Sequence, residues 1–363
     1  MALGNRDLNS LIMMTGWDAT ELENYRLQDG VSYAAIVNQI NAAIRALNSE
    51  LANDPLWAGL CHFTNEPTVE YRMGVSNGMN VHTEYSRPDT ARAQTEGHML
   101  PILPYDRVLG WTWDYLRKAR TEQVQADVAD ALKDVRDRWR IQILTRLLKR
   151  GDDSGASKGL GSSGYSPGFA TTAASTSVDF VPPAFGGTTF ASTHEHCVGI
   201  AGGVFTNAVF SDAYDELREH GHEAPFDFLI GPSDRATVEA LSDFTPVADR
   251  LVQLGQDTAV ARLAPEEFIG THSHFRIREI RGIPQYYGIG YKSYGMRSQR
   301  NPLRIRLEKG QSTPRVIALP DPRAGSGHYP LQDLMLYLEF GVGVGDRTAG
   351  TPRYVNSATW ADG

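Results

Sequence analysis

A stretch near the end of the chain alternates strictly in side-chain character. Its even positions are all apolar: Leu334, Leu336, Leu338, Phe340, Val342 and Val344. A period of two predicts a β-strand with one buried face. On the opposite face, Gly341, Gly343 and Gly345 leave the end of the strand bare. We therefore predict that another group approaches these glycines closely, either the phosphate of a ligand or a second stretch of polypeptide.

A phosphate-binding loop would require a longer motif than this one. The dinucleotide fingerprint G-x-G-x-x-G lies between a strand and a helix, and an acidic residue follows about 20 positions later. The residues after Gly345 include Pro352 and show no helical stripe. We therefore expect protein at the glycine face, either a long helix or an adjoining strand. Gly343→Val should then disrupt folding or assembly. It should not abolish any binding of nucleotide, because we expect none.

The composition favours a soluble, folded protein over one that reads DNA. The chain has 363 residues, a length that is sufficient for two subdomains. Its hydrophobic fraction of 41% is ordinary for a soluble folded protein. Its 35 basic and 43 acidic residues give a net charge of −8, so its surface should repel nucleic acid. Cys61 and Cys197 are the only cysteines, which excludes a disulfide scaffold and fits a reducing cytoplasm. We expect no export signal and no membrane span.

Patterns in the first part of the chain predict a helix and then a β-hairpin. Apolar residues at helical spacing over residues 31–53 end before a proline, which indicates an amphipathic helix. Residues 69–75 and 79–85 each alternate, and Asn77-Gly78 between them is a favoured hairpin turn. The polar residues 86–106 then lead back toward a folded body.

The longest regular element is predicted from Thr112 to Arg150. Its apolar residues form one stripe, and such a helix would span roughly 50 Å at about 1.5 Å per residue. Basic residues in its last turn suit the helix dipole, and Gly151 can end the helix. Residues 151–168 are rich in glycine and serine, which predicts a flexible loop.

The second half of the chain alternates between helical and strand patterns. A helix around residues 209–217 should end at Gly221, and Ser233 can cap a short helix through Leu241. Strands are predicted at Phe226–Ile230, near Phe268–Ile280, and at Tyr286–Tyr291 and Leu303–Leu307.

One short motif matches the sequence pattern of a nucleophile elbow but not its structural context. Residues Gly74–Gly78 have the form G-x-S-x-G, which places a catalytic serine between a strand and a helix. Here a second alternating strand follows, so we interpret these glycines as turn residues and assign no nucleophile.

Histidines are the strongest candidates for chemistry. The run His194-Glu195-His196-Cys197 is followed by further histidines at positions 220, 222, 272 and 274. These side chains could ligate zinc, but their spacing matches neither H-E-x-x-H nor paired C-x-x-C. Hydrogen-bonded packing or polar surface is the competing interpretation, and we assign no metal ligand.

Two other clusters fit structural roles better than binding roles. The aromatic stretch Trp111–Tyr115 precedes an amphipathic helix, where aromatic residues usually anchor a core or an interface. The arginines between Arg297 and Arg306 could contact phosphate, although a solvated or subunit-facing strand is commoner. We therefore assign no catalytic, cofactor-binding or metal residue and no cofactor, and expect a protein that is not an enzyme.

The order of the predicted elements is more informative than any single motif. An arm, an extended two-stranded loop, a long helix, a mixed α/β region and a closing strand follow one another. This order resembles the major capsid proteins of tailed bacteriophages, whose Hong Kong 97-like fold is shared with encapsulin shells. The likeness covers roughly residues 66–355.

Particular stretches carry the resemblance. Gly97–Pro101, leading into Leu109–Trp113, is similar to the junction of extension loop and spine helix in capsid proteins of phages of actinobacteria and related hosts. Phe210–Pro225 is similar to a helix and turn of their axial domain. The remaining matches are Ile269-Gly270, Ile283-Pro284, Tyr329-Pro330-Leu331, Phe340–Val344 and Arg347.

The resemblance implies an α+β fold with an N-terminal arm, an extended β-hairpin (the E-loop), a long spine helix, a peripheral (P) domain and an axial (A) domain. The implied boundaries are 1–65 for the arm with its amphipathic helix, 66–105 for the E-loop, 106–187 for the peripheral domain with spine helix and Gly/Ser loop, 188–330 for the axial domain, and 331–363 for a strand returning to the peripheral domain.

The resemblance also implies a function. The chain would be a major capsid protein that assembles into hexamers and pentamers of an icosahedral shell around the double-stranded DNA of a tailed phage or prophage. Implied partners are scaffolding, portal and decoration proteins, and DNA held without sequence-specific contact; no membrane is involved. The protein would be located in the virion after assembly in the host cytoplasm.

Two alternatives stay open at this point. An encapsulin-type compartment would enclose a cargo enzyme instead of a genome. A metal-dependent hydrolase would use His194, His196 and Cys197, and stoichiometric zinc in the purified protein would favour it.

Overall fold

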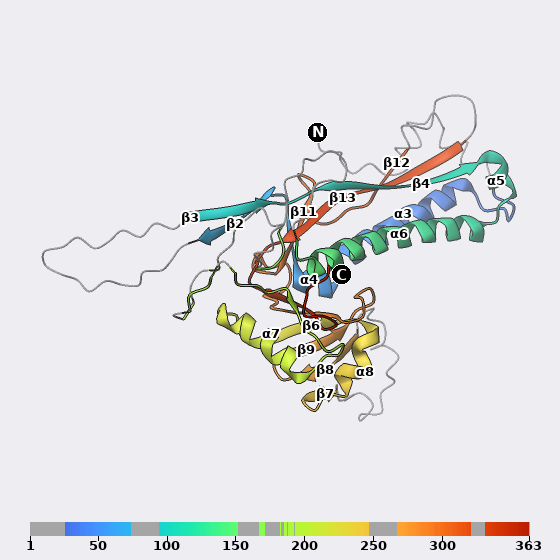
Figure 1. Cartoon of the computed structure of the whole chain (residues 1–363). Coiled ribbons are helices and arrows are strands. Elements are labelled where there is room, and N and C mark those ends of the chain that lie inside the picture. Colours follow the sequence, from blue (N-terminus) through green and yellow to red (C-terminus); the bar gives the residue numbers. More distant parts are fainter. Residues whose placement is uncertain are drawn as a thin grey trace, which may run out of the picture.

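The computed structural model describes residues 26–73, 94–151, 167–170, 182, 185–186, 188–191, 193–246, 267–320 and 331–362. Within these residues, two β-sheets are joined by a long helix, and a two-stranded ribbon projects from the body (Figure 1). The Gly74–Gly78 motif, the predicted strand 79–85 and residues 152–166 of the Gly/Ser-rich loop lie outside the described residues.

The alternating stretch forms the central strand of the first sheet, as predicted. This strand, β13 (Leu331–Val344), pairs antiparallel with three other strands. The sheet contains five strands in the order β1-β11-β13-β12, with β4 paired to the other edge of β13. Its other members are β1 (Cys61–Thr64), β4 (Leu103–Thr112), β11 (Leu303–Leu307) and β12 (Ile317–Pro320).

The two faces of β13 meet different partners. Its even-numbered side chains from Leu336 onward are buried in the main core, where the Phe340 ring lies 4.7 Å from the ring of Trp139. On the other face, a Cβ built at Gly341 would overlap the carbonyl oxygen of Pro101. The group that approaches the glycines is therefore polypeptide, as expected. At Gly341 it is the backbone just before β4, and at Gly345 it is the side chain of Arg304 and the carbonyl of Asn301. The expected long helix covers the opposite face.

Helix α3 (Tyr33–Asn53) forms as the sequence predicts. The hydroxyl of Ser32 accepts a hydrogen bond from the Ala35 N–H at 3.3 Å and so caps its first turn. Asp54 ends the helix, and its carboxylate then accepts the Leu56 N–H at the start of α4 (Pro55–Leu60).

The long helix is interrupted, which corrects the prediction of one element from 112 to 150. Helix α5 (Trp113–Lys118) ends at Ala119, and α6 (Thr121–Leu148) begins after an extended residue, Arg120. The break is held from outside, because Gln28 donates its N–H to the carbonyl of Ala119 at 3.0 Å. The carboxylate of Asp29 accepts the Thr121 N–H at 2.9 Å.

Helix α6 links the two sheets. Beside α3, it packs its apolar stripe under the first sheet (Figure 1). Its last turns reach the second sheet, where a Cβ at Gly282 would lie 2.9 Å from a methyl group of Leu144. At the end of the helix, the buried guanidinium of Arg146 donates to the carbonyls of Lys149 at 2.6 Å and Gly151 at 2.9 Å. These bonds satisfy acceptors that have no partner within the helix.

The second sheet contains seven strands in the order β5-β14-β10-β6-β9-β8-β7. The strands are β5 (Val198–Gly199), β6 (Phe226–Ile230), β7 (Phe244–Pro246), β8 (Glu267–His272), β9 (Phe275–Glu279), β10 (Tyr287–Tyr291) and β14 (Gly350–Tyr354). Strand β6 has the predicted bounds, but the single strand expected over 268–280 is the hairpin of β8 and β9.

Two short helical elements and α7 accompany this sheet. Helix α7 (Asn207–Glu219) ends near the predicted Gly221, which has a positive φ of 80°. A 3₁₀ turn, η1 (Pro232–Asp234), leads into α8 (Arg235–Glu239). The predicted cap at Ser233 is therefore wrong, because this residue lies inside the turn and gives no side-chain cap bond.

Each face of the second sheet contributes to a separate core. Phe226, Phe228 and Ile230 of β6 belong to a cluster with apolar residues of α7. The intervening Leu229 belongs to the main core, which also contains the stripe of α6. Burial on both faces explains why β6 is apolar at every position except Asp227, whose buried carboxylate pairs with Arg276 at 2.6 Å.

The projecting ribbon differs from the predicted hairpin in its pairing. Strand β2 (Thr68–Met73) pairs antiparallel with β3 (Gln94–Met99), and Met73 lies opposite Gln94. The first predicted strand is therefore present and pairs with β3, whereas the partner predicted for it at 79–85 lies outside the described residues. The turn signal at Asn77-Gly78 suggested a short connection, whereas residues 74–93 separate the paired strands.

The sheets divide the chain differently from the boundary at residue 330. Strands β11 and β12 precede that boundary but pair with β13 in the first sheet. Strand β14 follows it and pairs with β10 in the second sheet. The chain therefore crosses between sheets between Val344 and Gly350.

Candidate functional site

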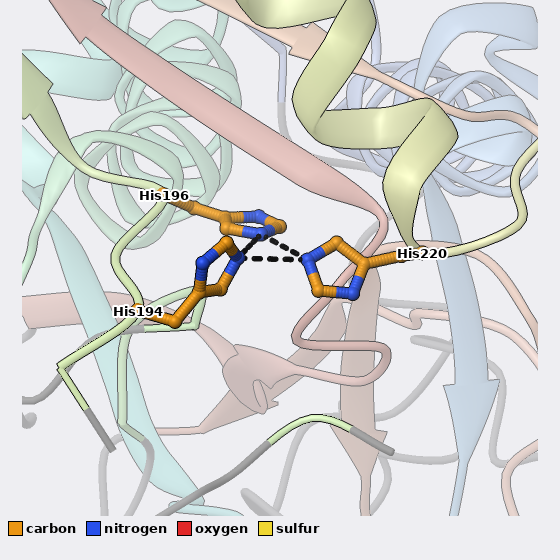
Figure 2. Close-up of side chains that lie close together, drawn as sticks. All are labelled: His194, His196 and His220. Atoms are coloured by element: carbon orange, nitrogen blue, oxygen red, sulfur yellow. Dashed lines mark hydrogen bonds between the residues drawn. The ribbon is translucent and has the colours of Figure 1, made fainter. Parts of the chain in front are cut away.

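Three of the histidines singled out in the sequence converge on one point. The Nε2 atoms of His194, His196 and His220 lie 3.1 Å, 2.7 Å and 2.9 Å apart, taken pairwise. Figure 2 shows the three rings pointing their Nε2 atoms toward one another. Among the described residues, they form the one group of histidine, cysteine and acidic side chains arranged to hold a metal ion.

Three parts of the fold position these rings. His194 and His196 lie on the irregular segment before β5, and the backbone N–H of His196 donates to the carbonyl of Ala170 at 2.7 Å. His220 directly follows the last residue of α7. The ring of His196 also reaches the start of β14, where its Nδ1 lies 2.8 Å from the carbonyl oxygen of Gly350.

The surroundings keep the imidazoles neutral. Burial, and then the neighbouring charges, lower the pKa of His196 to about 3. Burial and the other two rings lower the pKa of His220 to about 2, and burial also lowers the pKa of His194. At neutral pH all three rings can therefore offer a nitrogen lone pair.

The other candidate ligands lie elsewhere. Cys197 is buried but outside the group, and burial raises its thiol pKa to about 12. His222 is bound by the hydroxyls of Tyr294 at 2.6 Å and Thr348 at 3.0 Å. His272 bonds to Asn207 at 2.9 Å. The third ligand in the alternative of a hydrolase using His194, His196 and Cys197 is therefore wrong, because Cys197 lies outside the group.

The aromatic stretch before the spine is an anchor, as interpreted from the sequence. Trp111 is 9% exposed and belongs to the main core. Its indole N–H donates to a carboxylate oxygen of Asp127 at 2.9 Å, and the Tyr115 hydroxyl lies 3.3 Å from the same oxygen. The stretch thus ties the end of β4 to α6.

The arginines between 297 and 306 bind within the chain. Arg297 donates to the carbonyl of Ala52 and lies over the ring of Phe63, and Arg306 donates to the carbonyl of Leu100 at 2.8 Å. The sequence predicts phosphate contact or, more commonly, a solvated or subunit-facing strand, and neither role describes the contacts that these two side chains make within the chain. They fasten separate segments together.

A groove runs between α6 and the first sheet. It encloses about 470 Å³ and is lined mainly by residues of β4, α6 and β13. Arg107 and Asp134 form an ion pair of 3.2 Å across it. Ile141 of α6 also lines this groove, which we call the spine groove, and 52% of its surface is exposed. The groove therefore combines charged and apolar surface.

The ribbon of β2 and β3 is fastened at its base. The Leu100 N–H donates to the carbonyl of Pro67 at 2.7 Å, and Val69 and His98 are buried. Burial, and then the charge of Arg347, lower the pKa of His98 to about 3. Met99, next to His98, is 50% exposed. The base of the ribbon is thus held by a backbone hydrogen bond and by two buried side chains.

None of the helices in the described parts of the chain is long and apolar enough to cross a bilayer.

Comparisons with known proteins give matches in structure only. No protein-family model matches the chain, and no curated protein matches its sequence. A solved structure from Mycobacterium phage Patience is similar over 100% of this chain and 97% of that chain, with a TM-score of 0.64 and 18% identity. The capsid of the native GTA particle matches with a TM-score of 0.46 and 13% identity, over 83% of this chain and 89% of that chain. The holo-SrpI encapsulin complex from Synechococcus elongatus matches with a TM-score of 0.45 and 12% identity, over 86% of this chain and 90% of that chain.

The first of these matches shows the fold. Full-length similarity at a TM-score of 0.64 means that the same elements follow one another in the same arrangement. The chain therefore has the Hong Kong 97-like capsid fold that its element order predicted.

Proposed function

We propose that this chain is the major capsid protein of a tailed phage or prophage, and that it assembles into an icosahedral shell around double-stranded DNA. The observation that carries the proposal is the likeness of the whole chain, from end to end, to a phage protein of the Hong Kong 97-like fold.

The shape of the subunit supports this role. The β2–β3 ribbon projects from the body and exposes Glu70 and Met99, so it is suited to lie over a neighbouring subunit (Figure 1). The spine groove, with Ile141 exposed, offers apolar surface at a second place. Contacts at several places on each subunit make a closed shell cooperative, because every subunit is held by several neighbours.

The remaining partners belong to the same proposal. Scaffolding, portal and decoration proteins would contact the shell, and the DNA would be packaged without sequence-specific contacts. The net charge of −8 agrees with a container, because a strongly basic lining would grip DNA and hinder its release. Assembly would take place in the host cytoplasm, and the protein would act as a structural component without catalysis.

Electron microscopy of the purified, tag-free protein tests the proposal. We expect closed shells or regular hexameric tiles, and shells from infected cells should contain double-stranded DNA. A discrete monomer or dimer at high protein concentration would overturn it. Shells that lack nucleic acid and co-purify with an enzyme would instead identify a compartment of the encapsulin type.

A further inference from the structure

The histidine group poses a proton problem. Three Nε2 atoms lie within hydrogen-bond distance of one another, and each one is either protonated or not. Because three atoms share two states, at least two of them must be alike. One of the three contacts then places two N–H groups, or two lone pairs, against each other. No arrangement of protons satisfies all three contacts, whereas a cation between the rings would receive a lone pair from each.

We propose that His194, His196 and His220 bind one divalent transition-metal ion, and that this ion is Zn²⁺. Neutral imidazole is a favoured ligand of zinc, and three histidines with a fourth ligand complete a tetrahedral site. The site lies within a single chain, so it is independent of the proposed shell function.

The ring of His196 is already in the ligating tautomer. Its Nδ1 lies 2.8 Å from the carbonyl oxygen of Gly350, which can only accept a hydrogen bond. Nδ1 therefore carries the proton, and Nε2 presents its lone pair to the group. A backbone carbonyl that orients a histidine in this way is the usual second partner of a metal ligand.

The distances need only a small adjustment. Zn–N bonds of about 2.0 Å at tetrahedral angles place the nitrogens about 3.3 Å apart. The present separations of 2.7 Å to 3.1 Å are a few tenths of an ångström shorter. Outward rotation of the partly exposed His194 ring, whose side chain is 19% exposed, would supply part of this expansion.

A carboxylate stands beside the rings. Oε1 of Glu219 lies 3.3 Å from the Nε2 atom of His194 and 4.0 Å from that of His220. This oxygen can become the fourth ligand directly, or it can hold a water molecule in that position. Phe190 covers the group from the side, with ring centres 4.4 Å from His220 and 4.9 Å from His194.

The ion would cross-link segments that are separate in the sequence. It would join the segment before β5 to the end of α7, and through His196 to the start of β14. These segments are separate in sequence and meet at one edge of the second sheet. Metal binding to the folded state alone would raise its stability.

The test uses the tag-free subunit after removal of metal with a chelator. We expect it to bind one Zn²⁺ per chain, measured by competition with a chromogenic chelator, and one Co²⁺ with the intense visible absorption of tetrahedral coordination. Saturating Zn²⁺ should raise the melting temperature. His194→Gln removes the most exposed of the three rings, so it should keep the fold and weaken Zn²⁺ binding by at least about tenfold.

His274→Gln is the matched control. This exposed histidine stacks on Tyr214 and lies outside the group, so the substitution should leave Zn²⁺ affinity and the cobalt spectrum unchanged. The proposal is overturned if folded wild-type protein, confirmed by circular dichroism, binds no Zn²⁺ or Co²⁺ at micromolar concentrations. It is equally overturned if His194→Gln binds the metal as tightly as the control does.

Discussion

At Gly341 the absence of a side chain allows one part of the chain to cross another. The carbonyl of Pro101 occupies the space that a Cβ would need. Backbone cannot move aside as easily as the end of a flexible side chain, so this position accepts glycine alone. The sequence predicted a close approach here because alternation and glycine coincide. It could not identify Pro101, since nothing local to β13 indicates which distant segment lies over it.

Gly341→Ala should therefore destabilise the subunit by about 3 kcal/mol, as expected for overpacking against fixed backbone. Urea unfolding followed by circular dichroism measures the loss. Gly310→Ala is the control, because its Cβ would meet no atom and only the positive φ of 93° opposes it. That strain costs about 1 kcal/mol. Equal losses in both variants would contradict the assigned crossing.

His98 should make stability depend on pH. The unfolded imidazole takes up a proton near pH 6.5, whereas burial and Arg347 hold the folded-state pKa at about 3. The contribution of neutral His98 is therefore complete above pH 6.5 and declines as the pH falls toward 3. Between pH 7.5 and 5.0 we expect a loss of about 2 kcal/mol from this residue.

Urea titrations at the two pH values check this prediction. His98→Gln should reduce the loss on acidification, because it removes the group whose protonation favours the unfolded state. His274→Gln, at an exposed position, should leave it unchanged. If His98→Gln loses as much stability as wild type, His98 is not kept neutral in the fold.

The histidine group also marks a limit of residue-level prediction. The sequence indicates that His194 and His196 could share a metal ion, but the hydrolase alternative adds Cys197, and His220 is only one of four further candidate histidines. The third ring belongs to His220, which is 24 residues from His196. Its position depends on where α7 ends relative to the segment before β5. Only the packed sheet brings these two segments together.

At the scale of elements, periodic patterns located the helices and strands well but missed their ends and partners. Strand β6 has the expected bounds, and helix α3 ends where expected and begins two residues later than predicted, because their patterns are strong and their boundaries carry turn residues. The spine was expected to be continuous because the apolar stripe does not stop at Ala119. Its interruption depends on Gln28 and Asp29, which bind the break from another part of the chain.

Two neighbouring positions on α6 separate folding from assembly. Trp139 is 1% exposed and contacts Phe340, so Trp139→Ala should cost about 4 kcal/mol of folding stability. Ile141, two residues later, is 52% exposed, and Ile141→Ala should change stability by less than about 0.5 kcal/mol. Thermal and urea unfolding of the two variants make the comparison.

Ile141→Asp extends this test to the proposed shell. A charge at this position should leave the subunit folded but reduce shell formation, measured by electron microscopy and sedimentation, because it interrupts the apolar part of the spine groove. Wild-type yields of shells would show that the groove stays free in the assembly.

At the scale of the whole molecule, the projecting ribbon is the part whose removal should affect assembly most. Because Met73 and Gln94 lie opposite each other, an Asn-Gly turn can replace residues 74–93 and close the hairpin. The shortened chain should melt near the wild-type temperature, because it keeps every described residue of both cores. It should fail to form shells, which sedimentation velocity would detect. Normal shells would contradict a role for this segment in contacts between subunits.

The pairing of the first sheet also determines when the chain can fold. Strand β1 lies parallel to β11, and Asn48 of α3 exchanges two hydrogen bonds with the backbone of Val316, 268 residues farther along the chain. While the ribosome is still synthesising the protein, α3 and the spine helix therefore lack the strands that cover them. Their apolar stripes stay exposed until translation is almost complete. The subunit thus passes through an aggregation-prone stage during its synthesis, and a chaperone that shields nascent helices should raise its yield.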